Sequence, residues 1–145
     1  MDMYCPFKFH LNKRNHLWIF RFRRKNAVII IPSTLVSLKV SATFSSVGVP
    51  SFFCDPAQAL HGDMGQIEKK DILIIFSYSG NTSELNNMLK YANRYRIKII
   101  GVASKPDSIL LKASDIKIIL PKVKEADTTG VVPTSSTSIT LLFGD

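Results

Sequence analysis

The sequence predicts an α/β fold in which helices cover both faces of a parallel sheet, giving three layers. Apolar runs of strand length alternate with helical patterns from about residue 40 onward, and such an alternation is typical of a parallel α/β sheet. The run 72–76 contains no polar residue, as expected of a strand that is buried on both faces. The chain has 145 residues, of which 46% are hydrophobic, so it is long enough for one domain with a core and too short for two.

Helices are predicted where apolar side chains recur three and four residues apart, because this spacing places them on one helical face. The clearest example follows the run 72–76, and its apolar residues are Leu85, Met88, Leu89 and Ala92. From this spacing, and from the hydroxyl residues, glycines and prolines that bound the segments, we expect helices at 36–46, 82–93, 108–113 and 134–143.

Strands are predicted where short, continuous apolar runs are bounded by proline, glycine or charged residues. Besides 72–76, these runs are 49–53, 97–102 and 116–120. A polar segment rich in small residues, 55–65, lies between the first of them and 72–76. The predicted order from residue 36 is therefore helix, strand and polar segment, followed by strands and helices in alternation.

Positive charge is concentrated in the first 40 residues. The whole chain has 19 Lys and Arg and 11 Asp and Glu, a net charge of +8, whereas residues 41–145 are nearly neutral. Basic residues beside aromatic ones can bind nucleic acid, and here they are Arg21, Arg23, Arg24 and Lys25 with Trp18, Phe20 and Phe22. An unfolded or misread tail explains this stretch better, because the pattern of helices and strands breaks off near residue 40. We therefore divide the chain into a basic segment, 1–40, and a domain, 41–145, and predict no nucleic-acid partner.

Cysteine content and hydropathy bear on the location of the protein. Cys5 and Cys54 are the only cysteines, too few and too far apart for a disulfide framework or a metal cluster. The apolar runs fall well short of the ~18–20 residues that a membrane span needs. We therefore predict a cytoplasmic protein that has no membrane partner.

A candidate phosphate site lies between the run 72–76 and the helix 82–93. The residues there are Ser77-Tyr78-Ser79-Gly80-Asn81-Thr82-Ser83-Glu84. Open α/β sheets bind ligands at the carboxyl ends of their strands. The hydroxyl groups of Ser77, Ser79 and Thr82, a glycine that permits close approach and the free N–H groups of a helix N-terminus together suit a phosphate. The alternative is a plain turn in which Ser79 or Thr82 caps the helix.

A second group of hydroxyl residues, Thr134-Ser135-Ser136-Thr137, lies at the start of the helix 134–143, and Ser135, Ser136 and Thr137 are its candidate phosphate contacts. Alone it reads best as helix capping, but two such groups in one small α/β domain favour a phosphorylated ligand. Glu125 and His61 carry less information. A loop carboxylate becomes a candidate general base only beside a ligand, and a single histidine is more often structural than metal-binding.

From Ala42 onward the chain resembles the sugar isomerase (SIS) domain family, and within it the arabinose-5-phosphate isomerase branch. The serine-rich loop 77–84 marks the family broadly. The match also includes Ala42-Thr43-Phe44-Ser45-Ser46-Val47-Gly48 and the closing Gly144-Asp145. The segments that point to the branch are His61-Gly62-Asp63-Met64-Gly65, Lys124-Glu125-Ala126 and Pro133-Thr134-Ser135-Ser136-Thr137. The resemblance implies a flavodoxin-like, three-layer fold.

The resemblance also implies a reaction, the interconversion of D-ribulose 5-phosphate and D-arabinose 5-phosphate through an enediol. This is the first step toward the Kdo sugar of lipopolysaccharide. Residue by residue, Glu84 and Glu125 match the acid/base glutamates of the family. Ser77, Ser79 and Thr82 match its phosphate contacts.

A metal and an assembly are implied in the same way. His61 matches a histidine that can bind an inhibitory zinc, and the isomerisation itself requires no cofactor. Family members assemble as tetramers through this domain, which implies a homo-oligomer.

The chain departs from the family at both ends. Where the family has a strand that ends in a Gly-x-Gly-Lys-Ser loop with a catalytic lysine, this chain has Ile29-Ile30-Ile31-Pro32-Ser33-Thr34. We therefore expect a sheet that lacks one strand, and a frameshift or a misassigned start over 1–40. The chain also ends at Asp145, before a later histidine and the regulatory domains of the family. These differences predict a truncated isomerase with weak or no activity. The alternative is a phosphosugar-binding SIS domain of a regulator that catalyses nothing.

Overall fold

The computed structural model describes residues 10–11, 18–19, 26–129 and 132–145. Its main sheet consists of β3 (Ala27–Ile30), β4 (Ser51–Phe53), β5 (Ile72–Phe76), β6 (Lys98–Ala103) and β7 (Ile116–Ile119). The helices are α1 (Thr34–Ser46), α2 (Leu85–Tyr95), α3 (Ile109–Ala113) and α4 (Ser135–Gly144), with two short 3₁₀ helices, η1 (Ala59–His61) and η2 (Asp63–Gln66). A separate antiparallel pair is formed by β1 (His10–Leu11) and β2 (Trp18–Ile19).

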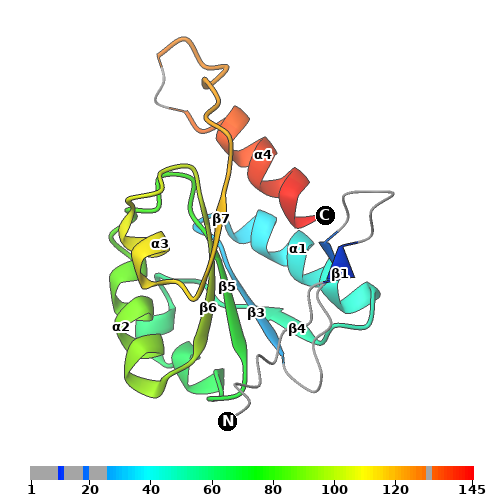
Figure 1. Cartoon of the computed structure of the whole chain (residues 1–145), viewed down its shortest axis with the longest axis vertical. Coiled ribbons are helices and arrows are strands. Elements are labelled where there is room, and N and C mark those ends of the chain that lie inside the picture. The colour runs from blue at the N-terminus through cyan, green and yellow to red at the C-terminus, as the bar shows by residue number, and fades with distance from the viewer. Residues whose placement is uncertain (1–9, 12–17, 20–25, 130–131) are drawn as a thin grey trace.

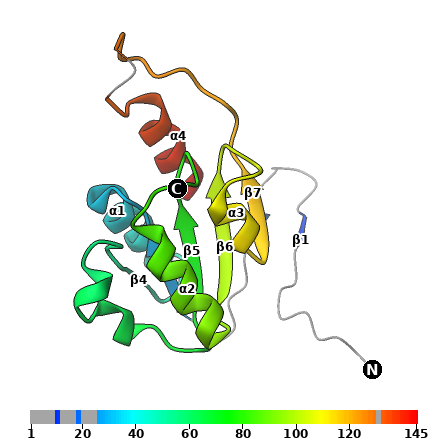
Figure 2. The same ribbon diagram turned by 90° about the vertical axis from the view of Figure 1, so that its left-hand side faces the viewer.

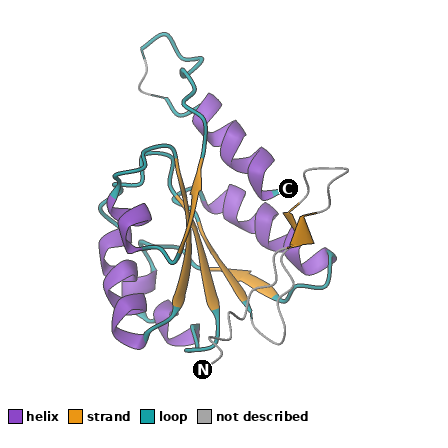
Figure 3. Cartoon of the chain, viewed as in Figure 1, coloured by secondary structure: helices purple, strands orange, loops and turns teal. Residues whose placement is uncertain are grey.

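The five strands of the main sheet are parallel and lie between two layers of helices (Figures 1 and 3). Helices α1 and α4 cover one face, and α2 and α3 cover the other. The predicted three-layer α/β fold is therefore confirmed. Each helix and strand predicted from residue 36 onward is present, with its ends within three residues of the prediction. Within the described ranges, no helix combines the length and the apolar character that crossing a membrane would take.

Strand β3 contradicts one expectation from the sequence. Because the loop that follows this strand in the family is absent here, the sequence predicts a sheet that lacks the strand, but β3 is present. β3 lies between β4 and β5 and is parallel to both, and all four of its residues are buried. The departure from the family loop begins only after this strand, at Ile31 and Pro32. An uninterrupted apolar run is enough to form a central parallel strand, whatever loop comes after it.

Alternate residues of the strands face two separate cores. Val28 and Leu73 lie in the core under α2 and α3, whereas Ile29 and Ile74 lie in the core under α1 and α4. Figure 2 views the face that α2 covers. The predicted apolar face of α2 is buried in the first core, and its residues are Leu85, Met88, Leu89 and Ala92. Both faces of the inner strands β3, β5 and β6 are therefore covered, and a ligand reaches these strands at their ends.

The strand order β4-β3-β5-β6-β7 indicates which ends these are. The chain passes from β3 to β4 on one side and later returns to place β5 on the other side, so the connections diverge between β3 and β5. In open α/β sheets, ligands bind in the crevice beyond the carboxyl ends of the strands at such a switch point. The loop 77–84 leaves β5 at this edge (Figure 1).

The basic residues Arg21, Arg23, Arg24 and Lys25 lie outside the described residues. The boundary that the sequence predicts at residue 40 therefore stays a prediction. The ordered sheet itself begins earlier, at Ala27.

Close packing of α3 on β6 predicts the effect of one substitution. A Cβ atom at Gly101 would lie 2.1 Å from the Oγ of Ser114, whose hydroxyl donates to the carbonyl of Leu110 at 2.7 Å. We expect Gly101→Ala to push α3 away from the sheet and to lower the free energy of unfolding by about 1–3 kcal/mol. Gly65→Ala is the matched control, because a Cβ there would meet nothing within 4 Å. Urea unfolding measures both variants, and equal midpoints would contradict this packing.

Candidate functional site

The loop 77–84 is closed by its own hydroxyl groups. The Oγ of Ser77, which is buried, lies 2.7 Å from the Oγ1 of Thr82 and accepts a hydrogen bond from the N–H of Gly80 at 3.1 Å. The Oγ of Ser79 accepts from the N–H of Asn81 at 3.3 Å. Three of the residues that the sequence predicts as phosphate contacts are thus brought together in one tight loop.

Helix α3 holds this loop from the side. The N–H of Leu110 donates to the carbonyl of Gly80, and the N–H of Ile109 donates to the Oδ1 of Asn81, both at 3.0 Å. Gly80 has a φ of +68°, and a Cβ there would lie 2.3 Å from the Oγ of Ser108. Position 80 therefore requires glycine both for its backbone conformation and for the close approach of α3.

The loop presents donors at the N-terminus of α2. Residue Glu84 occupies the N-cap position, and no side chain caps the helix, so the capping role suggested for Ser79 and Thr82 is wrong. In the part of the chain that the structure describes, the N–H groups of Ser79, Thr82, Ser83 and Glu84 donate to no protein acceptor. Unpaired N–H groups at the positive end of a helix form an anion-binding site.

Glu84 is exposed beside these donors. Its Oε2 accepts a hydrogen bond from the Oγ of Ser83 at 3.1 Å, the one hydrogen bond its side chain makes among the described residues. The carboxylate is therefore open to a ligand that the loop holds.

Glu125, the second predicted glutamate, is bound to the start of α4. Its Oε2 accepts from the N–H of Thr134 at 2.8 Å, from the Oγ1 of Thr134 at 2.9 Å and from the N–H of Ser136 at 3.2 Å. Hydrogen bonding from Ser136 and from the backbone of Thr134 lowers the pKa of Glu125 to about 2. Glu125 therefore caps α4 as a carboxylate.

The hydroxyl residues at the start of α4 have a different environment from those of the loop 77–84. Ser136 is buried, and Ser135 and Thr137 are half-buried in the first turn of α4. The capping interpretation of this helix start is partly right, but the cap comes from a distant carboxylate, Glu125, rather than from a hydroxyl of the helix.

His61 ends η1 and is exposed. No group of three or more His, Cys, Asp or Glu side chains able to hold a metal ion exists among the residues searched, which are those the structure describes. His61 would thus contribute a single ligand, and the predicted inhibitory zinc stays a prediction.

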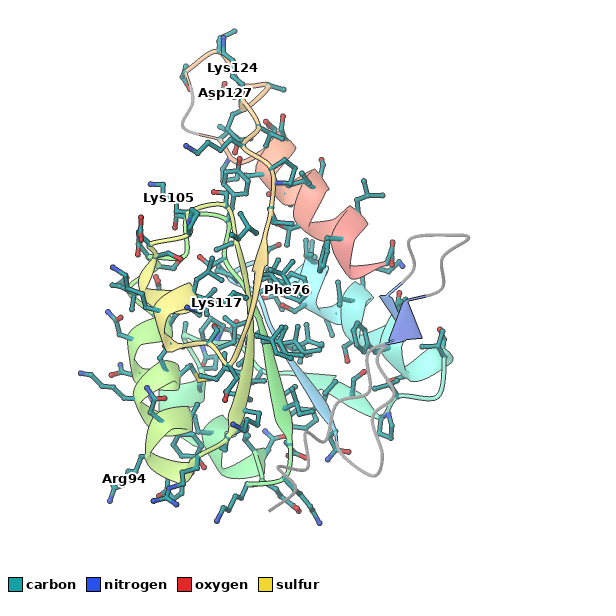
Figure 4. All side chains as sticks on the ribbon, viewed as in Figure 1. Phe76, Arg94, Lys105, Lys117, Lys124 and Asp127 are labelled. Atoms are coloured by element: carbon teal, nitrogen blue, oxygen red, sulfur yellow. The ribbon has the colours of Figure 1, made fainter. Side chains whose placement is uncertain are left out.

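The sequence analysis missed two residues that shape this edge, Tyr78 and Ser104. The carbonyl of Tyr78 accepts from the N–H of Ser104 at 2.9 Å and from its Oγ at 2.7 Å. Lys105 follows at the same end of the sheet, whereas Arg94 lies at the opposite end (Figure 4). No motif marks these positions, because their roles arise from the adjacency of β5 and β6 in space.

Comparisons with known proteins relate the chain to a family. Residues 32–145 match the SIS domain. The Escherichia coli K12 protein named arabinose 5-phosphate isomerase KdsD is 34% identical over 148 residues, covering 100% of this chain and 44% of the relative. The Francisella tularensis protein of the same name is 43% identical over 126 residues, covering 85% of this chain and 38% of the relative. The chain therefore spans less than half the length of these curated relatives.

Two solved structures are similar in fold. The protein c3406 of Escherichia coli CFT073, solved in complex with arabinose 5-phosphate, superposes with a TM-score of 0.80 at 33% identity, covering 84% of this chain and 66% of that chain. The NanR protein of Vibrio vulnificus, complexed with ManNAc-6P, superposes with a TM-score of 0.64 at 15% identity, covering 83% of this chain and 46% of that chain. The second similarity is one of fold alone.

The cap on α4 predicts how stability depends on pH. Above pH 4.5 the Glu125 carboxylate is ionised in the folded and the unfolded chain, and its hydrogen bonds stabilise the fold in full. As the pH falls from 4.5 to about 2, the unfolded chain takes up the proton first, so this stabilisation is lost. We expect Glu125→Gln to unfold at a lower temperature than the wild type at neutral pH, by a difference that shrinks over this range.

Thermal unfolding followed by circular dichroism measures this difference. Glu68→Gln is the control, since it removes one exposed negative charge far along the chain from α4. A difference between wild type and Glu125→Gln that stays constant down to pH 2 would show that the carboxylate does not cap the helix.

Proposed function

The chain belongs to the SIS-domain family, and on this basis we propose that it binds D-arabinose 5-phosphate and converts it slowly to D-ribulose 5-phosphate. The observation that carries the proposal is the set of N–H groups in the loop 77–84, at the switch point of the sheet, that have no acceptor among the described residues. The names of relatives at 34% and 43% identity support the choice of substrate. The reverse reaction would supply the precursor of the Kdo sugar of lipopolysaccharide.

The phosphate is proposed to lie on the loop 77–84. Backbone N–H groups at the start of α2 would donate to its oxygens, with the hydroxyl groups of Ser77, Ser79 and Thr82 around it. An anion there would gain from the helix dipole as well as from the hydrogen bonds. Ser135, Ser136 and Thr137 are proposed as weaker contacts, because Glu125 occupies the N-terminus of α4.

The isomerisation moves one proton between neighbouring carbons. A base takes the proton from C2 of the aldose, the enediol forms, and the proton returns to C1 while the oxygen protons rearrange to leave the C2 carbonyl. Glu84 is the better placed of the two predicted glutamates, since its carboxylate is exposed at the end of the loop. Glu125 has a pKa of about 2 and is a weak base at neutral pH, so its proposed role is to hold α4 beside the site.

Turnover is expected to be slow because the segment 31–34 contains no lysine. The proposed reaction requires no cofactor, since it consists of proton transfers alone. We place it in the cytoplasm, in keeping with the two cysteines of the chain and their wide separation. The alternative, a regulator without catalytic activity, has less support, because the curated relatives at 34% and 43% identity are named as isomerases.

A homo-oligomer is also proposed, through the outer face of α1 and α4. Leu35 and Leu38 of α1 are exposed, as are Leu142 and Phe143 of α4, with Leu35 80% and Leu142 77% accessible. These two helices pack together where Gly144 meets Val40. Exposed apolar side chains gathered on one side of a protein are typical of an interface with another subunit.

The proposed reaction predicts that binding and turnover separate in Glu84→Gln. We expect D-arabinose 5-phosphate to raise the unfolding temperature of the wild type and of Glu84→Gln alike, because the ligand stabilises the folded state by mass action. Turnover to D-ribulose 5-phosphate should fall by roughly 10²–10⁴-fold in Glu84→Gln, which lacks the general base. Thermal shift and a long-incubation assay of product measure the two effects.

Ser79→Ala tests the phosphate contact, and Ser46→Ala, at the exposed end of α1, is its matched control. The ligand should raise the unfolding temperature less in the first variant than in the second. Stabilisation of the wild type without any turnover would favour the regulator. The absence of any stabilisation would refute the whole proposal.

The proposed interface predicts a change of mass in solution. We expect the wild type to sediment as an oligomer and the double variant Leu35→Lys/Leu142→Lys to sediment as a monomer, since buried charge opposes association. Ile109→Lys on α3, at an equally apolar and half-exposed position on the other face, is the control and should leave the mass unchanged. Analytical ultracentrifugation measures this, and a wild type that is a monomer would exclude the interface.

A further inference from the structure

Tyr78 connects three loops at the carboxyl edge of the sheet. It lies between Ser77 and Ser79 of the phosphate loop, and its half-buried ring packs on the core under α1 and α4. Its carbonyl accepts two hydrogen bonds from Ser104, which follows β6. Its hydroxyl accepts from the N–H of Val123, which follows β7, at 2.6 Å.

The hydroxyl of Tyr78 both accepts from the segment after β7 and donates to it. Besides accepting from the Val123 N–H, it lies 3.3 Å from the carbonyl of Val123 and 3.4 Å from that of Pro121, so it can donate its single proton to either. Within the described residues, no other member of the loop 77–84 forms a hydrogen bond to the segment 121–129. A phenylalanine at position 78 would keep the ring and lose this connection.

The segment that Tyr78 holds carries Glu125. Only Lys124 separates Val123 from Glu125, whose carboxylate binds the start of α4. A continuous path of hydrogen bonds and backbone therefore runs from the phosphate loop through Tyr78 and Val123 to Glu125 and α4. A change in the phosphate loop can reach Glu125 along this path without a contact between Glu125 and the loop.

We propose that Tyr78 is a positioning residue that holds the segment 121–129, and Glu125 with it, in register with the occupied phosphate loop. The inference rests on the proposed function, because it assigns Tyr78 a role at the same site. Tyr78 does not touch the reacting atoms in this role. It acts through Val123, so its loss should affect the response of the segment 121–129 to the bound ligand more than the affinity for the ligand.

Hydrogen exchange with and without D-arabinose 5-phosphate tests this coupling. In the wild type, we expect the ligand to slow amide exchange in the loop 77–84 and also at Val123. In Tyr78→Phe, exchange should slow in the loop alone, and the Kd for the ligand should change less than about 3-fold. Where turnover is measurable, kcat should fall by about 10- to 100-fold with little change in KM, because Glu125 would no longer hold α4 in its place beside the site.

Tyr91→Phe is the matched control. Tyr91 is half-buried on α2, and its ring contacts Tyr95, but its hydroxyl makes no hydrogen bond in the described structure. Ligand-induced slowing at Val123 that persists in Tyr78→Phe would overturn the inference while leaving the proposed function intact. A wild type that does not bind the sugar phosphate would overturn both, and unligated exchange at Val123 that is equal in all three proteins would show that the hydroxyl holds nothing.

Discussion

The candidate site depends on the pairing of β3 with β4 on one side and β5 on the other. Hydrogen bonds along both edges of β3 bury its four residues and place the divergence of the connections between β3 and β5. The loop 77–84 gains its position from this arrangement, since it directly follows β5 at the carboxyl edge of the sheet. Without β3 the sheet would lose the strand between β4 and β5, and with it the switch point of the connections. The position of the buried strand β3 thus determines where the polar groups of the loop 77–84 can bind a ligand.

The N-termini of α2 and α4 differ in how they interact with negative charge. At the start of α2 the backbone donors remain unpaired among the described residues, and α3 holds the loop in shape through Gly80 and Asn81. At the start of α4, Glu125 already accepts from the N–H groups of Thr134 and Ser136, and its pKa falls as a result. The first arrangement leaves a place for an anion from outside, whereas in the second a carboxylate of the chain itself already lies at the helix N-terminus. This difference explains why the loop 77–84 is a stronger candidate for the phosphate site than the hydroxyl residues at the start of α4.

Most of the fold could be predicted from local pattern, and most of the site geometry could not. The apolar face of α2 follows from spacing alone, and the run 72–76 is recognisable as a buried strand without its neighbours. The prediction of a missing strand is wrong because the glycines and lysine absent after β3 say nothing about the strand itself. The cap from Glu125 to Ser136 spans eleven residues and forms only when α4 folds back, so no local pattern contains it. The contacts of Tyr78 depend on which strands are adjacent, and a sequence does not state this directly.

The central claim is that a sugar phosphate binds at the switch point through the backbone of one loop. An amide NMR titration of the chain with D-arabinose 5-phosphate tests it most directly, because each backbone N–H reports separately. The account predicts that the largest shifts occur at Ser79, Thr82, Ser83 and Glu84, whose N–H groups are unpaired in the described structure. The largest shifts at the start of α4, or at sites scattered over the surface, would contradict it.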